Sequence, residues 1–174
     1  MLHVMRKLLL LLTLALLPVA ASAGTPARKV SKTKITSVIS EARRYDGVEV
    51  VRLGKVATAA IKGLIRASAS EDSDAREALR MMRGIKNLTV LDYGDCDPAV
   101  RERLASRLDD ALGGSELLME AKESGGTSMQ MFGILDEQTD RVRDFVIHAP
   151  SEGALICLFG SIPMDILGKV AAND

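Results

Sequence analysis

Hydrophobic positions follow two different periods along this chain, and the change falls near residue 113. Before it, apolar residues recur three and four positions apart, as at Ile35, Val38 and Ile39, which is the spacing of one helix face. After it, short apolar segments are separated by breaks rich in Gly, Pro and Asp, which are typical of hairpins. The pattern predicts one α+β domain: a mixed, mostly antiparallel sheet with a C-terminal four-strand meander, packed against several α-helices.

The first half is expected to combine helices with two strands. Asp97 and Pro98 indicate a helix N-terminus, because Asp accepts hydrogen bonds from the first free amides and Pro fits the first turn. The helical residues between the two strands allow a crossover connection, so parallel pairing of those strands is permitted. Helices are expected over residues 35–42, 56–67, 74–84 and 98–112, and strands over 48–53 and 87–93.

The meander is expected to end in a buried strand followed by a helix. The segment 154–159, ALICLF, is apolar on both faces, which suits a central strand covered on both sides. Pro163 favours a first helical turn, so a change from strand to helix is expected after Gly160, with Leu167 on the apolar face of the closing helix. The four strands are expected over residues 115–123, 127–136, 141–149 and 154–160.

One register inside the meander stays open. A two-residue turn at Gly125 and Gly126 would place Met119 opposite Phe132, whereas a three-residue turn would place it opposite Met131. Methionine clusters can form adaptable binding surfaces, but the methionines of this hairpin are expected to fill the core.

The first 23 residues have the three parts of a signal peptide. Arg6 and Lys7 supply the charged region, residues 8–17 the apolar region, and residues 21–23 (Ala-Ser-Ala) the cleavage site before Gly24. The apolar region has about ten residues, roughly half of what a helix needs to cross a bilayer. The sequence therefore predicts export to the periplasm or beyond the cell. The expected organisation is a signal peptide at 1–23, a flexible leader at 24–34 and one folded domain at 35–174.

Charge and composition argue against a nucleic-acid partner. Without Arg6 and Lys7, the 23 basic residues of the chain fall to 21, against 23 acidic residues, which gives a formal charge of −2. Nucleic-acid binding needs a concentrated basic surface instead. Trp is absent, and Tyr and Phe are few. The sequence therefore also disfavours a sugar-binding site built on stacked aromatic rings.

The densest polar motif is DYGDCDP, in which Asp92, Asp95 and Asp97 surround Cys96. Three carboxylates so close together at a strand end have the chemistry of a calcium or magnesium site. The motif lacks the central Gly and terminal Glu of an EF-hand loop. Asp97 is instead expected to cap the helix that begins at Pro98, and Asp95 adds charge near its N-terminus. The carboxylates are therefore predicted to be structural, and no metal or cofactor is predicted.

His148 is the only histidine after residue 23, and it lies at the end of the third meander strand. One histidine makes no multi-histidine metal site, and no serine stands in the G-x-S-x-G pattern of a nucleophile elbow. The C-x-x-C, P-loop and dinucleotide-binding patterns are absent as well. His148 is therefore predicted to be a surface residue, solvated or hydrogen-bonded, and no catalytic residue is assigned.

Cys96 and Cys157 are the two cysteines of the chain, and two interpretations compete. An even count in an oxidising compartment favours a disulfide between them. The apolar surroundings of Cys157 favour an unpaired packing residue instead, since free cysteine is among the most often buried residues. A disulfide also needs Cα atoms within about 7 Å, which a mid-strand residue and a loop beyond a strand seldom reach. The unpaired, buried Cys157 is preferred.

Two stretches, MMRGIKNLTVLDY at 81–93 and RVRDFVIHAPSEGALICLFGSIPMDILGKV at 141–170, combine turn glycines with apolar faces. Together they resemble the domain-of-unknown-function family 4252, which consists of small exported proteins of bacterial envelopes. The resemblance covers Ile35 to the C-terminus and implies a fold and a location, but no catalytic residue. Many members are lipoproteins. This chain has Ala-Ser-Ala at 21–23 where a lipid-bearing cysteine would stand, so no lipid anchor is expected.

The sequence favours a non-catalytic exported protein that binds a partner protein of the envelope. Two alternatives stay open: an exported hydrolase that uses carboxylates near Asp92 to Asp97, and a carrier of a small apolar ligand held between sheet and helices. An enzyme would gather polar residues in one deep pocket, whereas a binding module would expose an apolar sheet face or edge.

Overall fold

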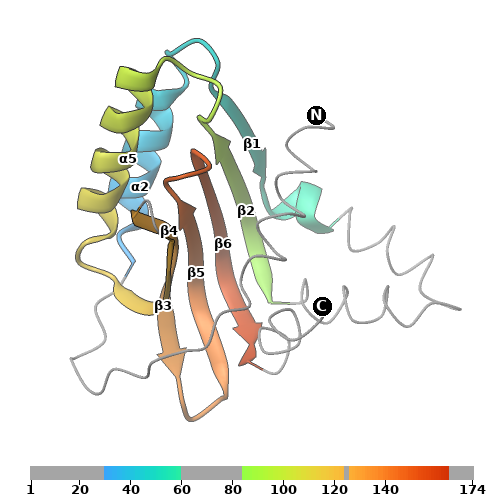
Figure 1. The fold of residues 1–174 in the computed structure, drawn as a ribbon. Coiled ribbons are helices and arrows are strands. Elements are labelled where there is room, and N and C mark those ends of the chain that lie inside the picture. Colours follow the sequence, from blue (N-terminus) through green and yellow to red (C-terminus); the bar gives the residue numbers. More distant parts are fainter. Residues whose placement is uncertain (1–29, 60–83, 124–125, 165–174) are drawn as a thin grey trace, which may run out of the picture.

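The computed structural model describes residues 30–59, 84–123 and 126–164, and these residues form a single α+β domain (Figure 1). Six strands make one sheet in the order β1-β2-β6-β5-β4-β3, and every neighbouring pair is antiparallel. The predicted fold class and the C-terminal meander β3–β6 are confirmed. The elements are α2 (Lys32–Ala42), β1 (Glu49–Leu53), β2 (Ile85–Asp92), α5 (Pro98–Leu112), β3 (Glu116–Glu123), β4 (Gly126–Asp136), β5 (Arg141–Ala149) and β6 (Ala154–Pro163).

Several expectations fall wholly or partly on residues outside the described ranges. These are the signal peptide, most of the leader, the helix over 74–84 and the closing helix after residue 164. Of the helix expected over 56–67, residues 56–59 are described and are helical. Helix α2 begins at Lys32, inside the segment that the sequence pattern assigns to the leader.

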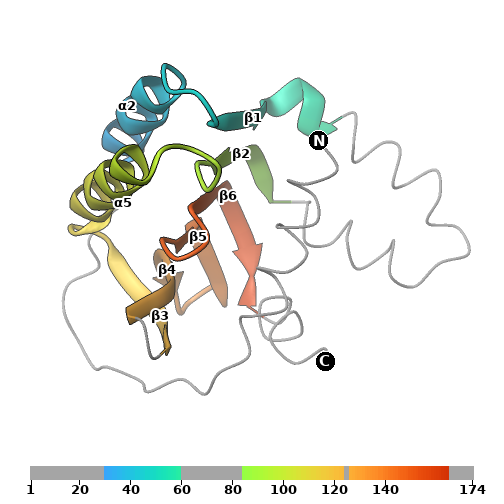
Figure 2. The same cartoon turned by 45° about the horizontal axis from the view of Figure 1, so that its top comes forward.

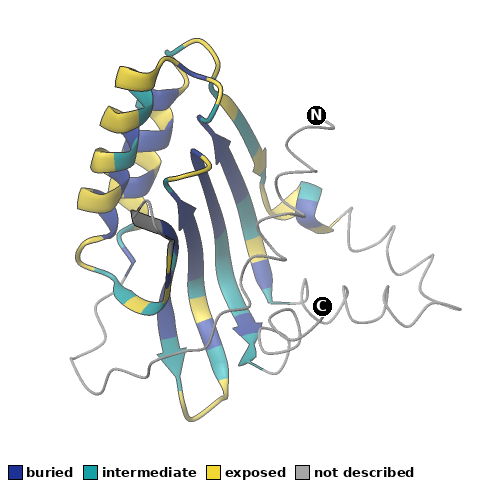
Figure 3. Ribbon diagram, in the orientation of Figure 1, coloured by how far each residue is buried: buried dark blue, intermediate teal, exposed yellow. Residues whose placement is uncertain are grey.

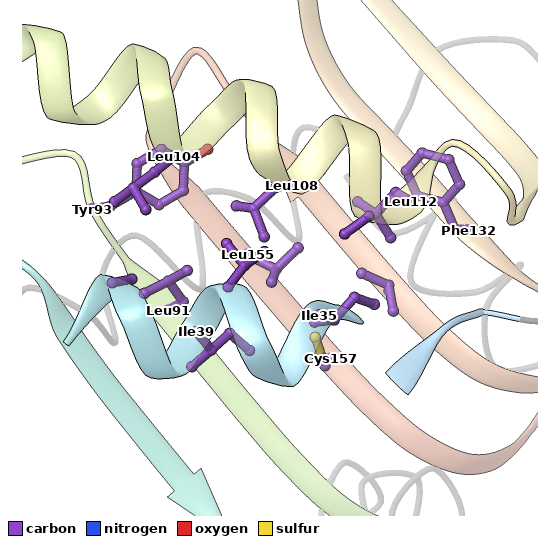
Figure 4. Close-up of a cluster of buried hydrophobic side chains, with 14 of the residues drawn as sticks. Ile35, Ile39, Leu91, Tyr93, Leu104, Leu108, Leu112, Phe132, Leu155 and Cys157 are labelled. Atoms are coloured by element: carbon purple, nitrogen blue, oxygen red, sulfur yellow. The ribbon is translucent and has the colours of Figure 1, made fainter. Parts of the chain in front are cut away.

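Helices α2 and α5 lie side by side on one face of the sheet (Figures 1 and 2). The face that α2 turns inward carries the four apolar residues expected from their spacing, and α5 buries a leucine at every fourth position. Both sets pack on residues of β2, β4, β5 and β6 in one apolar cluster (Figure 4). The buried residues of the two helices are Ile35, Val38, Ile39 and Ala42 in α2, and Leu104, Leu108, Ala111 and Leu112 in α5.

The first half of the central strand β6, Ala154 to Cys157, is buried on both of its faces, and most of its second half is partly buried (Figure 3). It pairs with β2 on one side and with β5 on the other. Leu155 and Cys157 belong to the cluster under the helices, whereas Ala154 and Ile156 belong to a second apolar cluster on the opposite face. Alternate residues of one strand therefore contribute to two cores.

The permitted parallel pairing of the first two strands is wrong, because β1 and β2 are antiparallel. Glu49 lies opposite Asp92, and Leu53 lies opposite Leu88. A connection of this length can return the chain in either direction, so its length alone does not fix the pairing. The open register of the hairpin β3–β4 is also settled, since Met119 lies opposite Met131 after a shift at Leu118.

The expected change from strand to helix after Gly160 falls later, because β6 continues to Pro163 and Met164 is the first helical residue after it. The amide of Ser161 donates to the carbonyl oxygen of Gly84 at 3.0 Å and keeps the chain in the sheet. Gly160 has φ +144°, and a Cβ there would lie 2.2 Å from the same Gly84 oxygen. The glycine therefore marks an irregularity inside the strand and not its end.

A bulge in β5 decides which side chains face the helices. Asp144 has φ +53°, and the register of β5 shifts beside it. As a result, Val142 and Phe145 lie in the same cluster on the far face, and Val146 lies under the helices. The Asp144 carboxylate accepts from the Gly160 amide at 3.3 Å and pairs with Lys32 of α2 at 2.8 Å. This local bend places His148, two residues after Val146, on the helix side.

Candidate functional site

Tyr93 and His148 form a buried polar pair between the sheet and α5, and both are 0% exposed. Tyr93 directly follows β2, and His148 lies in β5 between Gln130 of β4 and Leu155 of β6. The hydroxyl oxygen of Tyr93 lies 2.9 Å from Nε2 of His148, which is a hydrogen-bonding distance. The pair therefore links the end of β2 to β5 across the intervening strand β6.

Asp109 of α5 places a carboxylate on the other side of the His148 ring. Its Oδ1 lies 3.1 Å from Nδ1 of His148, and its side chain is 55% exposed. The two groups are close enough for an ion pair, but they are not aligned as a hydrogen bond, and Nδ1 has no hydrogen-bond partner among the described residues. We call Tyr93, His148 and Asp109 the His148 cluster. It leads from the interior of the domain to its surface.

Burial raises the pKa of Tyr93 well above its usual value of 10, and the negative charge of Asp109 raises it further. Arg101 of α5 lowers this pKa, because its positive charge favours the phenolate. The Arg101 guanidinium also donates to the carbonyl oxygen of Ser151 in the β5–β6 turn. Tyr93 is therefore a neutral phenol at physiological pH, and its hydroxyl is able either to donate to His148 or to accept from it.

A carboxylate, an imidazole and a hydroxyl in a row have the composition of a Ser-His-Asp triad. A nucleophilic hydroxyl must be accessible and activated by its base. The Tyr93 hydroxyl belongs to a side chain with no exposed surface, and the pKa of that side chain is raised, which is the opposite of activation. The cluster therefore has the chemistry of a polar tie between α5 and the sheet.

The prediction that His148 is a surface residue is wrong. A strand end was expected to be solvated, but α5 lies over this end of β5 and buries the ring. The signal that was available is the alternation along the strand, which places His148 on the same face as Val146. No local pattern connects Tyr93 or Asp109 with His148, since the three residues meet only through the sheet order and the position of α5.

Two acidic residues of the DYGDCDP motif, Asp92 and Asp97, accept hydrogen bonds from nearby backbone amides. Asp97 caps α5, as predicted, because its side chain accepts a hydrogen bond from the Ala99 amide at 2.9 Å. Asp92 is buried, and its Oδ1 accepts from the Gly94 amide at 3.1 Å. Asp95 is exposed. Within residues 30–59, 84–123 and 126–164, no group of three or more His, Cys, Asp or Glu side chains is placed to hold a metal ion.

Both cysteines are buried free thiols. Cys157 lies in the core beneath the helices, near Ile35 in the view of Figure 4, and burial raises its pKa to about 12. The predicted packing role of Cys157 is confirmed. Cys96 was expected in a polar turn, but it is also buried, and its thiol donates to the Tyr93 carbonyl oxygen at 2.8 Å. Burial raises the pKa of Cys96 as well.

Two hollows lie on the helical side of the domain, and Ser37 of α2 lines both. One has a volume of about 290 Å³ and lies between α2 and α5, with Val38 and Ala111 among its apolar lining residues. The other, of about 380 Å³, lies along α2 toward Tyr45. The remaining lining residues are polar or charged: Lys34, Arg107 and Asp110 in the first hollow, and Ser40, Glu41 and Arg44 in the second.

Comparisons with protein-family models, with curated protein sequences and with solved structures give no match to this chain. Among the described residues, no helix is long and apolar enough to cross a membrane.

Proposed function

We propose that this protein is an exported, non-catalytic binding module, and that it binds another envelope protein through the outer face of α2 and α5. The observation that carries the proposal is the pair of adjoining hollows on this face, which share Ser37 and are lined by charged side chains of both helices. Export rests on the signal-peptide pattern at 1–23, and the envelope location rests on the resemblance to family 4252.

The charges of this face favour a protein partner. Arg107 and Glu41 form an ion pair across the two helices, and Lys34, Arg44 and Asp110 surround it. Positive and negative groups are thus interspersed, and such a surface is complemented by another protein with the opposite arrangement. A polyanion such as a nucleic acid would need charges of one sign instead.

Few large apolar side chains are exposed at the edges of the described sheet, so these edges are weaker candidates for a binding surface than the helical face. Among the described residues, the exposed large apolar side chains are Val56, at 85%, and Leu117, at 47%. Val56 follows β1, and Leu117 lies in β3, and these two strands are at opposite edges of the sheet. The two side chains therefore form no common apolar patch.

Site-specific photo-crosslinking in cells that produce the protein tests the proposal. A photoreactive residue in place of Ser37 should give a discrete adduct with another envelope protein, whereas one in place of the exposed Glu137 in the β4–β5 turn should not. Reversing a charge with Lys34→Glu should weaken the Ser37 adduct, and Arg143→Glu on β5 is the matched control that should leave it unchanged. Equal adducts from both positions, or a Ser37 adduct indifferent to Lys34→Glu, would refute the proposed surface.

A further inference from the structure

Each nitrogen of the His148 ring lies close to an oxygen that can accept a hydrogen bond, from Tyr93 at Nε2 and from Asp109 at Nδ1. A neutral imidazole needs one donor partner and one acceptor partner, and a protonated imidazole needs two acceptors. The Tyr93 hydroxyl at Nε2 serves both states, because it donates to a bare nitrogen and accepts from a protonated one. The carboxylate of Asp109 lies 3.1 Å from Nδ1, unaligned in the structure, and it can only accept. With Asp109 aligned, a doubly protonated ring would have an acceptor at each of its nitrogens.

Asp109 occupies a position in α5 where a nearby positive charge is favourable. It lies in the last turn of the helix, where the backbone carbonyls give a partial negative charge, and that turn contains no basic residue. A carboxylate alone is unfavourable there. A protonated His148, 3.1 Å away, would supply the missing positive charge.

The other groups near His148 do not substitute for that charge. Around the ring, β4 contributes the neutral Gln130, and β6 contributes the apolar Leu155. After β2 come the phenol of Tyr93 and the thiol of Cys96, and burial raises the pKa of both. From α5 there are Asp109 and, at the other end of the helix, Arg101, which is bound to the Ser151 carbonyl oxygen.

We propose that the His148 cluster is a proton-binding site that latches α5: when His148 takes up a proton, its ion pair with Asp109 closes and holds the last turn of α5 more firmly against the sheet. In the structure this contact is loose, because Asp109 and Nδ1 approach to 3.1 Å without the alignment of a hydrogen bond. The latch is independent of the proposed binding function. It would act on that function only because α5 forms one side of the proposed surface.

Nuclear magnetic resonance on the full chain tests the latch directly. The His148 ring signals are followed between about pH 5 and 8, where imidazoles titrate. In protein that retains residues 1–23, His3→Gln identifies the signals of the other histidine. Over the same range, hydrogen-exchange protection in the last turn of α5, corrected for intrinsic rates, should rise by roughly threefold or more as the pH falls. Its midpoint should coincide with that of the ring signals.

Two variants separate the latch from general effects of pH. Asp109→Asn removes the charge at an exposed helical position and should abolish the rise in protection while the ring still titrates. Asp110→Asn, its exposed neighbour, should leave the rise intact. The proposal is overturned by a ring that does not titrate in the folded protein, by protection that stays flat while the ring titrates, or by an unchanged rise in Asp109→Asn. None of these results bears on the crosslinks at Ser37, so the two proposals fail separately.

Discussion

At the scale of single residues, specific hydrogen bonds hold two of the buried polar sites of this domain. The Tyr93 hydroxyl and Nε2 of His148 are hydrogen-bonded to one another, and the Asp92 carboxylate accepts from the Gly94 amide. An unpaired polar group in such a place costs more than a made hydrogen bond contributes, so each pair is sensitive to the loss of one member. The Tyr93–His148 pair is the clearest case, because neither side chain has any exposed surface.

Removing one hydroxyl from this pair should therefore be costly. Tyr93→Phe keeps the ring volume but leaves Nε2 of His148 without its partner, and it should lower the free energy of unfolding by about 1–3 kcal/mol. Tyr45→Phe is a matched control, since Tyr45 is the other tyrosine and is only partly buried. Chemical denaturation of both variants measures the difference. Equal losses would show that the Tyr93–His148 hydrogen bond adds nothing.

Alkaline pH gives a second measure of the same residue. The pKa of Tyr93 in the folded state is raised above its unfolded value of 10.0, so its contribution to stability is complete below pH 10 and is lost as the pH rises beyond that value. The wild-type protein should lose stability above pH 10 more steeply than Tyr93→Phe does.

At the scale of helices and strands, local sequence chemistry sets most boundaries, and α5 shows how. Asp97 accepts the Ala99 amide and Pro98 occupies the first helical position. We expect Asp97→Ala to cost about 1 kcal/mol of unfolding free energy through the lost cap. Asp110→Ala on the same helix is the control. It should cost nothing, because an acidic group in a last turn is unfavourable. Thermal and urea unfolding compare the two, and equal effects would contradict the capping role.

The same chemistry explains which elements could be predicted. The period of apolar residues and the turn residues were enough for α2, α5 and the four meander strands, since these signals are local. The bulges were not predictable in this way. Asp144 holds a positive φ because its carboxylate meets Gly160 and Lys32, and Gly160 stays in the sheet because Ser161 bonds to Gly84. Each depends on a partner that is distant in the sequence.

At the scale of the whole molecule, the strand order creates the sites that the sequence could not assign. Strand β6, the last of the strands that the structure describes, inserts between β2 and β5. With this strand order, Tyr93, the residue after β2, reaches His148 of β5. Helix α5 then places Asp109 against the His148 ring. His148 could have been recognised as inward-facing from its spacing to Val146, but its two partners required the assembled sheet.

The strand order also bears on whether the two cysteines are joined. Cys157 lies opposite Thr89 of β2, and Asp92 lies opposite Ala154, three residues further along the pair. At ~3.3 Å per residue, the end of β2 is about 10 Å from Cys157. Cys96 lies beyond that end, where its sulfur contacts the Tyr93 carbonyl.

We therefore predict two free thiols per chain in protein that is unfolded without reductant, because bridged cysteines need Cα atoms within about 7 Å. The same protein after full reduction provides the control and should give the same count. In the folded protein, Cys157 should react with thiol reagents far more slowly than in the unfolded chain, since its pKa of about 12 keeps it protonated and its side chain is inaccessible. A monomer that shows no thiol until it is reduced would establish the Cys96–Cys157 disulfide, and β2 and β6 would then have to shift along one another to allow it.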